Sequence, residues 1–206
     1  MKNKMKTILC LIALCALIAT LHAAQYSWPT FKANLVQVDP FTNKVLTSQY
    51  YCDATKKIIR YESSNAIQRY IQFVEPTKFT VITYTIGNDQ SIVCNTAKTD
   101  NSVYFGNLLE GGTYLGLKAL NSTIGLAYNV PKFLGQVHAT YVIDSFTNYP
   151  ALVTFEKKEY YPAVFTNAAE LTAAESNALF SIPKEITCKD VTNTRTTGAQ
   201  VKIFRF

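Results

Sequence analysis

The stretch KFTVITYTI, residues 78–86, decides the fold class of this chain. Its β-branched and aromatic residues are typical of a β-strand, and turn residues bound it on both sides. In a strand, Phe79 and Val81 lie on one face. Ile82 and Tyr84 lie on the other face. A strand that is apolar on both faces is covered on both faces, so we expect a sheet with a layer on each side.

Short segments of similar composition, punctuated by turn residues, fill the rest of the chain. Asn167 precedes Glu170 by three residues, a capping-box spacing, and predicts one short helix running through Phe180 until Pro183 ends it. The fold class is therefore mainly β with minor α. Two architectures explain the two-sided strands: two sheets packed face to face, or one curved sheet around an apolar cavity. Further strands are predicted at residues 31–38, 44–52, 57–62, 70–74, 91–96, 114–119, 125–128, 136–143 and 151–156.

The first 23 residues have the features of a cleavable signal peptide. Three lysines precede an apolar run over residues 8–19, and small residues follow around Ala23. The run is too short to cross about 30 Å of hydrocarbon. We therefore expect a secreted protein with a signal peptide at residues 1–23, one domain at 24–188 and a C-terminal tail at 189–206.

The charge of the processed chain argues against a nucleic-acid partner. Without the three lysines of the signal peptide, 17 basic residues face 14 acidic ones, a formal net charge of +3. The basic residues are scattered and form no stripe that would neutralise successive phosphates.

Three cysteines remain in the processed chain, Cys52, Cys94 and Cys188. In an oxidising compartment an odd number predicts one disulfide and one leftover thiol, so one cysteine is free or paired to another chain. The sequon that begins at Asn121 predicts a glycan on a surface loop.

The sequence contains no recognisable catalytic constellation. Nucleophilic catalysis usually needs a histidine base, and the processed chain has only His138, which we expect at an exposed strand position rather than paired with Cys52. A Gly-x-Ser-x-Gly elbow, a Gly-rich phosphate loop, a zinc-type cluster of Cys and His and an EF-hand loop are all absent from the sequence. We therefore expect no enzyme activity, no metal and no cofactor.

Several segments, in order, resemble the ependymin-related family of secreted glycoproteins. The hairpin at residues 50–61 resembles that family's early aromatic, aspartate and basic-aliphatic hairpin. Residues 93–95 resemble its cysteine strand, and Phe180-Ser181-Ile182-Pro183 running to Cys188 resembles its closing segment; residues 114–116 and 149–153 keep a similar order between them. The resemblance implies a single curved antiparallel sheet, a half-barrel like that of bacterial lipoprotein carriers, with a short helix packed on it. It also implies a hydrophobic pocket for a lipid-like ligand, a disulfide between Cys94 and Cys188, and roles in calcium binding and adhesion.

The leading prediction is a secreted or lysosomal non-enzymatic protein that binds a hydrophobic or lipid-like ligand in the concavity of the sheet. Tyrosines, with Arg60 or Lys57, would meet the head group. One alternative is an extracellular adhesion or matrix protein without a small ligand, either calcium-linked or a homodimer joined through Cys52. A hydrolase of unrecognised type that depends on His138 is the other alternative. Strand parity selects the candidate ligand-binding residues: Ile59, Tyr61, Ile82, Tyr84 and Tyr141.

Overall fold

The computed structural model describes residues 26–192, apart from residues 40, 87–89, 121–122, 135–136 and 158–159. The predicted signal peptide, the sequon asparagine Asn121 and the tail beyond residue 192 lie outside the described residues. Within the part that is described, no helix is long and apolar enough to cross a membrane.

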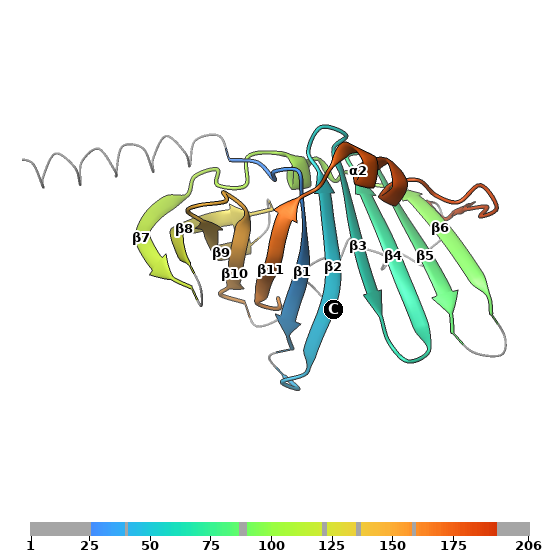
Figure 1. Ribbon diagram of the computed structural model, residues 1–206, viewed down its shortest axis with the longest axis horizontal. Helices are drawn as coiled ribbons and strands as arrows, with labels where there is room; N and C mark the ends of the chain where they lie inside the picture. The colour runs from blue at the N-terminus through green and yellow to red at the C-terminus, as the bar shows by residue number, and fades with distance from the viewer. Residues whose placement is uncertain are drawn as a thin grey trace, which may run out of the picture.

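Twelve strands form one curved, unclosed sheet in the order β12-β6-β5-β4-β3-β2-β1-β11-β10-β9-β8-β7 (Figure 1). Neighbouring strands are antiparallel except β12 and β6, which are parallel. A 3-10 helix, η1 (Ser102–Phe105), and one α-helix, α2 (Ala173–Leu179), complete the described elements. The prediction of a mainly β fold with one curved sheet and a short helix packed on it is therefore confirmed. The strands are β1 (Phe31–Val38), β2 (Val45–Asp53), β3 (Ile58–Ser64), β4 (Gln68–Glu75), β5 (Lys78–Thr85), β6 (Ile92–Lys98), β7 (Thr113–Ala119), β8 (Ile124–Phe133), β9 (Val137–Asp144), β10 (Pro150–Phe155), β11 (Ala163–Glu170) and β12 (Lys189–Asp190).

The direction of curvature follows from the contacts of Trp28. Its ring centroid lies 5.7 Å from that of Tyr50 on β2 and 5.9 Å from that of Tyr141 on β9. These strands are four steps apart in the sheet, about 19 Å if the sheet were flat. One ring contacts both tyrosines only because the sheet curls around it. The face that carries Tyr50 and Tyr141 is therefore the concave face.

Two segments of the chain cover the concave face. Residues 26–30 bring Tyr26 and Trp28 into the core, and residues 101–112, here called the crossing segment, lie over the same core through Leu108 and Leu109. The two segments are joined where the Leu108 amide donates to the Tyr26 carbonyl at 2.8 Å. The hollow side of the sheet is thus largely filled by the protein's own side chains.

The convex face is covered by α2 and the residues after it, which lie across β2 to β6 (Figure 1). Lys32 on β1 pairs with Glu175 of α2, and Ser176 donates a hydrogen bond to the carboxylate of Asp53 on β2. Phe180, Ile182 and Ile186 then pack on a second, smaller apolar cluster of the convex face. Of the two apolar faces predicted for residues 78–86, the face with Ile82 and Tyr84 lies under this convex cover, and Phe79 of the other face is also buried.

The helix begins later than the sequence predicted. Asn167 and Glu170 belong to β11, where Glu170 pairs with Phe31 of β1, and the helix starts instead after Thr172. Thr172 and Glu175 form the capping box, with the Thr172 side chain accepting from the Glu175 amide and the Glu175 carboxylate accepting from the Thr172 amide. The predicted start at Asn167 was wrong because the ladder with β1 takes the backbone groups of 163–170.

The first residues of the predicted tail are part of the sheet. Lys189 and Asp190 form β12, which pairs with Asn95 and Thr96 of β6. The Val191 amide extends this ladder by donating to the Thr96 carbonyl at 2.8 Å.

Two hairpins turn on the same sequence pattern, Asp-x-Phe-Thr-Asn: residues 39–43 between β1 and β2, and 144–148 between β9 and β10. In each, the aspartate Oδ1 accepts from the amides of the Phe and the Thr that follow, and the Asn takes a positive φ, 55° and 61°. The antiparallel order from β1 through β11 and β10 to β9 places these two turns at opposite ends of the sheet. The end that holds residues 39–43 is called the tip end below.

Candidate binding site on the concave face

The centre of the concave face is a cluster of buried aromatic rings. Trp28 is at its middle, with ring centroids 6.0 Å from Phe31, 5.7 Å from Tyr50, 5.9 Å from Tyr141 and 5.9 Å from Phe165. Burial raises the pKa of the Tyr50 and Tyr141 hydroxyls far above the ordinary tyrosine value. Both hydroxyls are therefore neutral hydrogen-bonding groups inside an apolar layer.

Two buried polar groups of this cluster, Trp28 Nε1 and Tyr50 Oη, make no hydrogen bond to any residue that the structure describes. A buried donor without a partner is unfavourable, and native structures usually satisfy it with protein or with ordered water. The two groups are chemically suited to a water molecule or to the oxygen of a bound ligand.

The predicted ligand-binding residues divide between the two faces. Ile59, Tyr61 and Tyr141 lie buried in the concave core. Ile82 and Tyr84 lie on the convex face, in or against the smaller cluster. The structure therefore brings three of the five residues into one core but does not bring all five into one pocket.

The division follows from strand register. Glu62 pairs with Ile71, and Ile71 pairs with Ile82, so Ile82 shares a face with Glu62. Tyr61 precedes Glu62 in the same strand and points to the opposite face. Parity within one strand is visible in the sequence, but the parity between β3 and β5 depends on how residues 62–82 pair.

The predicted head-group residues lie away from the concave face. Arg60 alternates with Tyr61 and lies on the convex side, where it donates to the Leu179 carbonyl at 2.5 Å and to Glu62 at 2.7 Å. Lys57 is in the β2–β3 turn, at the end of the sheet opposite the tip end. Arg60 therefore fastens the end of α2 to the sheet.

A cavity of about 500 Å³ lies between the crossing segment and the end of β8. Its walls come from the crossing segment, which includes Val103, and from the end of β8 with the residue that follows it, which includes Lys132 and Leu134. Leu134 also belongs to the buried concave core. The lining residues are Val103, Gly106, Asn107, Glu110, Gly111, Pro131, Lys132 and Leu134.

The wall of this cavity that comes from the crossing segment begins at the end of the sheet opposite the tip end. Asn101, two residues before Val103, donates through its amide to the Pro76 carbonyl and through its side chain to the carbonyls of Glu75 and Lys78 at the β4–β5 turn. Val103 and the cavity wall that it forms therefore lie away from the turn at residues 39–43.

The volume of the cavity is within the usual range of small-ligand sites, roughly 300–1,000 Å³, and its lining combines apolar residues with an ammonium group and a carboxylate. Among the lining residues Leu134 alone is buried, so the cavity is an open hollow at the surface.

A second cavity, of about 250 Å³, lies on the convex side beneath the end of α2. It is lined by Lys56, Ile58, Glu75, Asn177, Phe180 and Ser181. Its one lysine is already engaged, because Lys56 Nζ donates to Ser176 and to Asn177 at 2.7 Å each. The convex cavity is therefore smaller than the concave one, and its lysine is held by α2.

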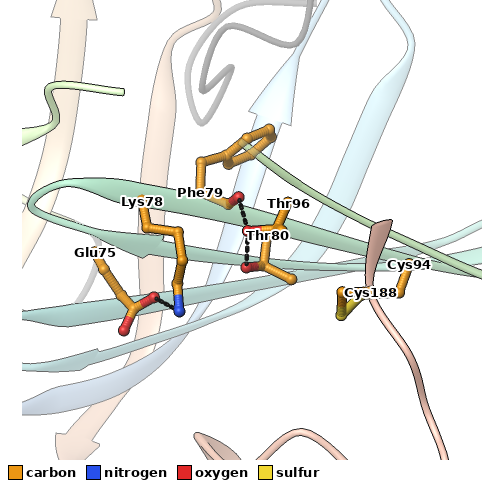
Figure 2. Close-up of a disulfide and its surroundings, with 7 residues drawn as sticks. All are labelled: Glu75, Lys78, Phe79, Thr80, Cys94, Thr96 and Cys188. Atoms are coloured by element: carbon orange, nitrogen blue, oxygen red, sulfur yellow. Dashed lines mark hydrogen bonds and ion pairs between the residues drawn. A yellow bond between two sulfur atoms is a disulfide. The ribbon is translucent and has the colours of Figure 1, made fainter. Parts of the chain in front are cut away.

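The disulfide implied by the family resemblance is confirmed. Figure 2 shows Cys94 of β6 bonded to Cys188, which immediately precedes β12, with Cα atoms 4.5 Å apart. The same figure shows Thr80 and Thr96 beside it on β5 and β6, and the ion pair between Glu75 and Lys78 at the β4–β5 turn. The bond attaches the segment after α2 to the convex face.

Cys52 and His138 do not meet. Cys52 is buried in the concave core, where desolvation raises the pKa of its thiol well above the ordinary value. His138 alternates with the concave residues Ala139 and Tyr141, so it lies on the convex side, where it pairs with Glu156. The sheet separates the two side chains, and a disulfide between Cys52 and another chain would require this core to open.

The described residues contain no group of three or more His, Cys, Asp or Glu side chains placed to hold a metal ion. The expectation of a calcium role, which came from the family resemblance, therefore has no supporting cluster in residues 26–192 outside the gaps.

Comparison with known proteins supports the fold. No family model matches the chain, and no curated protein matches it. Among solved structures, it is similar to an uncharacterized conserved protein from Thermus thermophilus, with a TM-score of 0.53 and 14% sequence identity over 86% of this chain and 98% of that one. At this identity the likeness concerns the fold alone, and membership in the ependymin-related family stays a hypothesis.

Proposed function

We propose that this chain is a non-enzymatic binding protein that holds a small hydrophobic or lipid-like ligand at the concave face of its sheet. The observation that carries the proposal is the cavity of about 500 Å³ between the crossing segment and β8. Leu134 belongs both to the cavity lining and to the concave core. An apolar chain that enters the cavity therefore removes part of its surface from water and contacts this core. Each buried methylene of the ligand contributes about 0.8 kcal/mol.

The lining favours an amphipathic ligand over a purely apolar one. Val103, Pro131 and Leu134 supply the apolar surface, whereas Lys132 offers an ammonium group to a carboxylate or phosphate. Asn107 and Glu110 add further polar atoms to the lining. We therefore expect a ligand with one short acyl chain and an anionic or hydrogen-bonding head group. The same proposal includes that the protein is secreted or lysosomal and that it is related to the ependymin-related family.

The test is binding of a fluorescent fatty acid, 11-(dansylamino)undecanoic acid, to the delipidated protein. Val103→Trp fills part of the cavity with an indole ring. Because Val103 is 40% exposed, the replacement should lower the stability of the fold only slightly. The matched control is Val164→Trp, because Val164 is also 40% exposed but lies on the convex side of β11. The proposal predicts binding that Val103→Trp abolishes and Val164→Trp leaves intact.

Lys132→Glu separates the head-group contact from the cavity itself. The reversed charge should weaken binding of the anionic probe more than tenfold, which corresponds to about 1.4 kcal/mol, and should leave binding of an uncharged monoacylglycerol nearly unchanged. Absence of binding to the wild-type protein, or equal loss in both tryptophan variants, would overturn the proposal.

A further inference from the structure

Exposed hydrophobic side chains gather at the tip end of the first six strands. Of the thirteen large hydrophobic residues that are exposed in the described part of the chain, seven lie at or beside the turns β1–β2, β3–β4 and β5–β6. In an antiparallel meander these three turns share one end, as Figure 1 shows at the bottom of the sheet. The seven are Val38, Phe41, Val45, Ile67, Ile86, Ile92 and Val93.

One residue at each turn is prominently exposed. Phe41 is 71% exposed, Ile67 is 64% exposed and Ile86 is 51% exposed. Isolated exposed hydrophobic residues are ordinary on protein surfaces, whereas here three adjoining turns at one end of the sheet each present one.

The other end of the same strands has the opposite character. The β2–β3 and β4–β5 turns present Lys56, Lys57, Glu75 and Lys78, with Glu75 and Lys78 paired at 2.9 Å (Figure 2). The two ends of the meander β1–β6 therefore differ: one presents charged side chains and no exposed large hydrophobic residue at its described turns, and the other presents exposed hydrophobic side chains beside Asp39 and Lys44. Such polarity along the strands orients a molecule at an interface between water and an apolar phase.

Two of the apolar turns also satisfy their own backbone. Asp39 Oδ1 accepts from the Phe41 amide at 2.8 Å, and Asn65 Oδ1 accepts from the Ile67 amide at 3.0 Å. The same Asp39 oxygen also accepts from the Thr42 amide, and the same Asn65 oxygen from the Gln68 amide. A backbone amide that is already bonded within the turn costs less to move out of water.

The third turn joins this row directly. The Ile86 amide donates to the Ile67 carbonyl at 2.7 Å, which continues the β4–β5 ladder one pair beyond its last registered residues. Ile67 and Ile86 are therefore neighbours across β4 and β5, about 5 Å apart, and the turn that carries Phe41 is about two strand spacings, or about 10 Å, farther along. The three side chains form a row about 15 Å long. Polar turn residues interrupt the row. A stable protein interface needs roughly 800 Å² of closely packed surface on each partner, whereas a lipid surface accepts protruding side chains one by one.

We propose that the tip end of β1–β6 docks on a lipid bilayer by inserting Phe41, Ile67 and Ile86 among the head groups. The strands would then stand on the surface with the charged turns in water. The docking surface does not depend on the ligand of the cavity.

The experiment is flotation of the delipidated protein with vesicles of phosphatidylcholine that contain a minor fraction of phosphatidylserine. The triple variant Phe41→Asp/Ile67→Asp/Ile86→Asp should lower the partition constant by on the order of tenfold or more, since three apolar contacts are replaced by charges. The matched control is Phe146→Asp. Phe146 is 81% exposed in the second turn with the pattern Asp-x-Phe-Thr-Asn, at residues 144–148. That turn lies at the opposite end of the sheet, so the replacement should leave flotation unchanged.

Near-ultraviolet circular dichroism verifies that each variant keeps its packed core. The proposal is overturned if the wild-type protein does not float, if the triple variant floats as the wild type does, or if Phe146→Asp is equally harmful. It is also overturned if the triple substitution abolishes a dimer in sedimentation velocity without changing flotation, because the tips would then contact a second copy. Val103→Trp should float normally, which separates a failure of docking from a failure of cavity binding.

Discussion

Removing the Cys94–Cys188 disulfide should cost this protein a large part of its stability. The bond joins residues 94 positions apart, and the loop-closure entropy lost from the unfolded chain then corresponds to about 4.7 kcal/mol at 25 °C. Domains are typically stable by only about 5–15 kcal/mol. We therefore expect the double variant Cys94→Ser/Cys188→Ser to remain folded at 25 °C with a free energy of unfolding lower by about 4–5 kcal/mol.

The assay is equilibrium unfolding in urea, followed by the fluorescence of Trp28, which lies in the concave core and reports on the side of the sheet away from the disulfide. Because the effect acts mainly on the unfolded chain, the fluorescence of the folded variant in the absence of urea should match that of the wild type. Wild-type protein unfolded with a reducing agent present should give the same midpoint as the double variant. A loss below about 1 kcal/mol, or a folded state with altered Trp28 emission, would refute this reasoning.

Two further predictions concern single ionisable groups. Burial of Cys52 raises the pKa of its thiol, so a disulfide reagent such as Ellman's reagent should modify it only in denaturant; rapid modification of the native protein would contradict the buried position. The hydrogen bond from Lys32 lowers the pKa of Glu175 to about 2 from an ordinary value of 4.5, so its ionised form stabilises the fold above pH 4.5 and that contribution is lost as the pH falls toward 2. Glu175→Gln should therefore lower the urea midpoint at pH 7 but not at about pH 2, and an equal difference at both pH values would count against the Lys32 contact.

The strands were predictable because their signals are local. The segment 31–38 forms β1 with the predicted bounds, and 78–86 becomes β5 with a shift of one residue, since β-branched and aromatic residues lie between clear turn residues. The helix start was mistaken because two capping-box spacings follow one another, at Asn167 and at Thr172. Only the pairing of 163–170 with β1 decides between them.

The candidate site was less accessible to sequence reasoning. Tyr61 and Tyr84 both alternate correctly within their own strands, but the pairing between β3, β4 and β5 places them on opposite faces. The cavity is bounded by the crossing segment. This segment is irregular, so its sequence has no hydrophobic periodicity from which its path over the sheet could be predicted. A usable signal was nevertheless present in the repeated pattern Asp-x-Phe-Thr-Asn, which marks two turns of the same geometry with an exposed Phe41 or Phe146.

The central claim is that the concave cavity is a binding site, and it can be tested without choosing a ligand in advance. Native mass spectrometry of the protein secreted by a eukaryotic host, followed by organic extraction, measures what the cavity carries. The account predicts one additional lipid-sized mass per chain in the wild type and its loss in Val103→Trp. A wild-type mass that corresponds to the bare polypeptide and any glycan, with no extractable lipid and no uptake of added fatty acid, would contradict it.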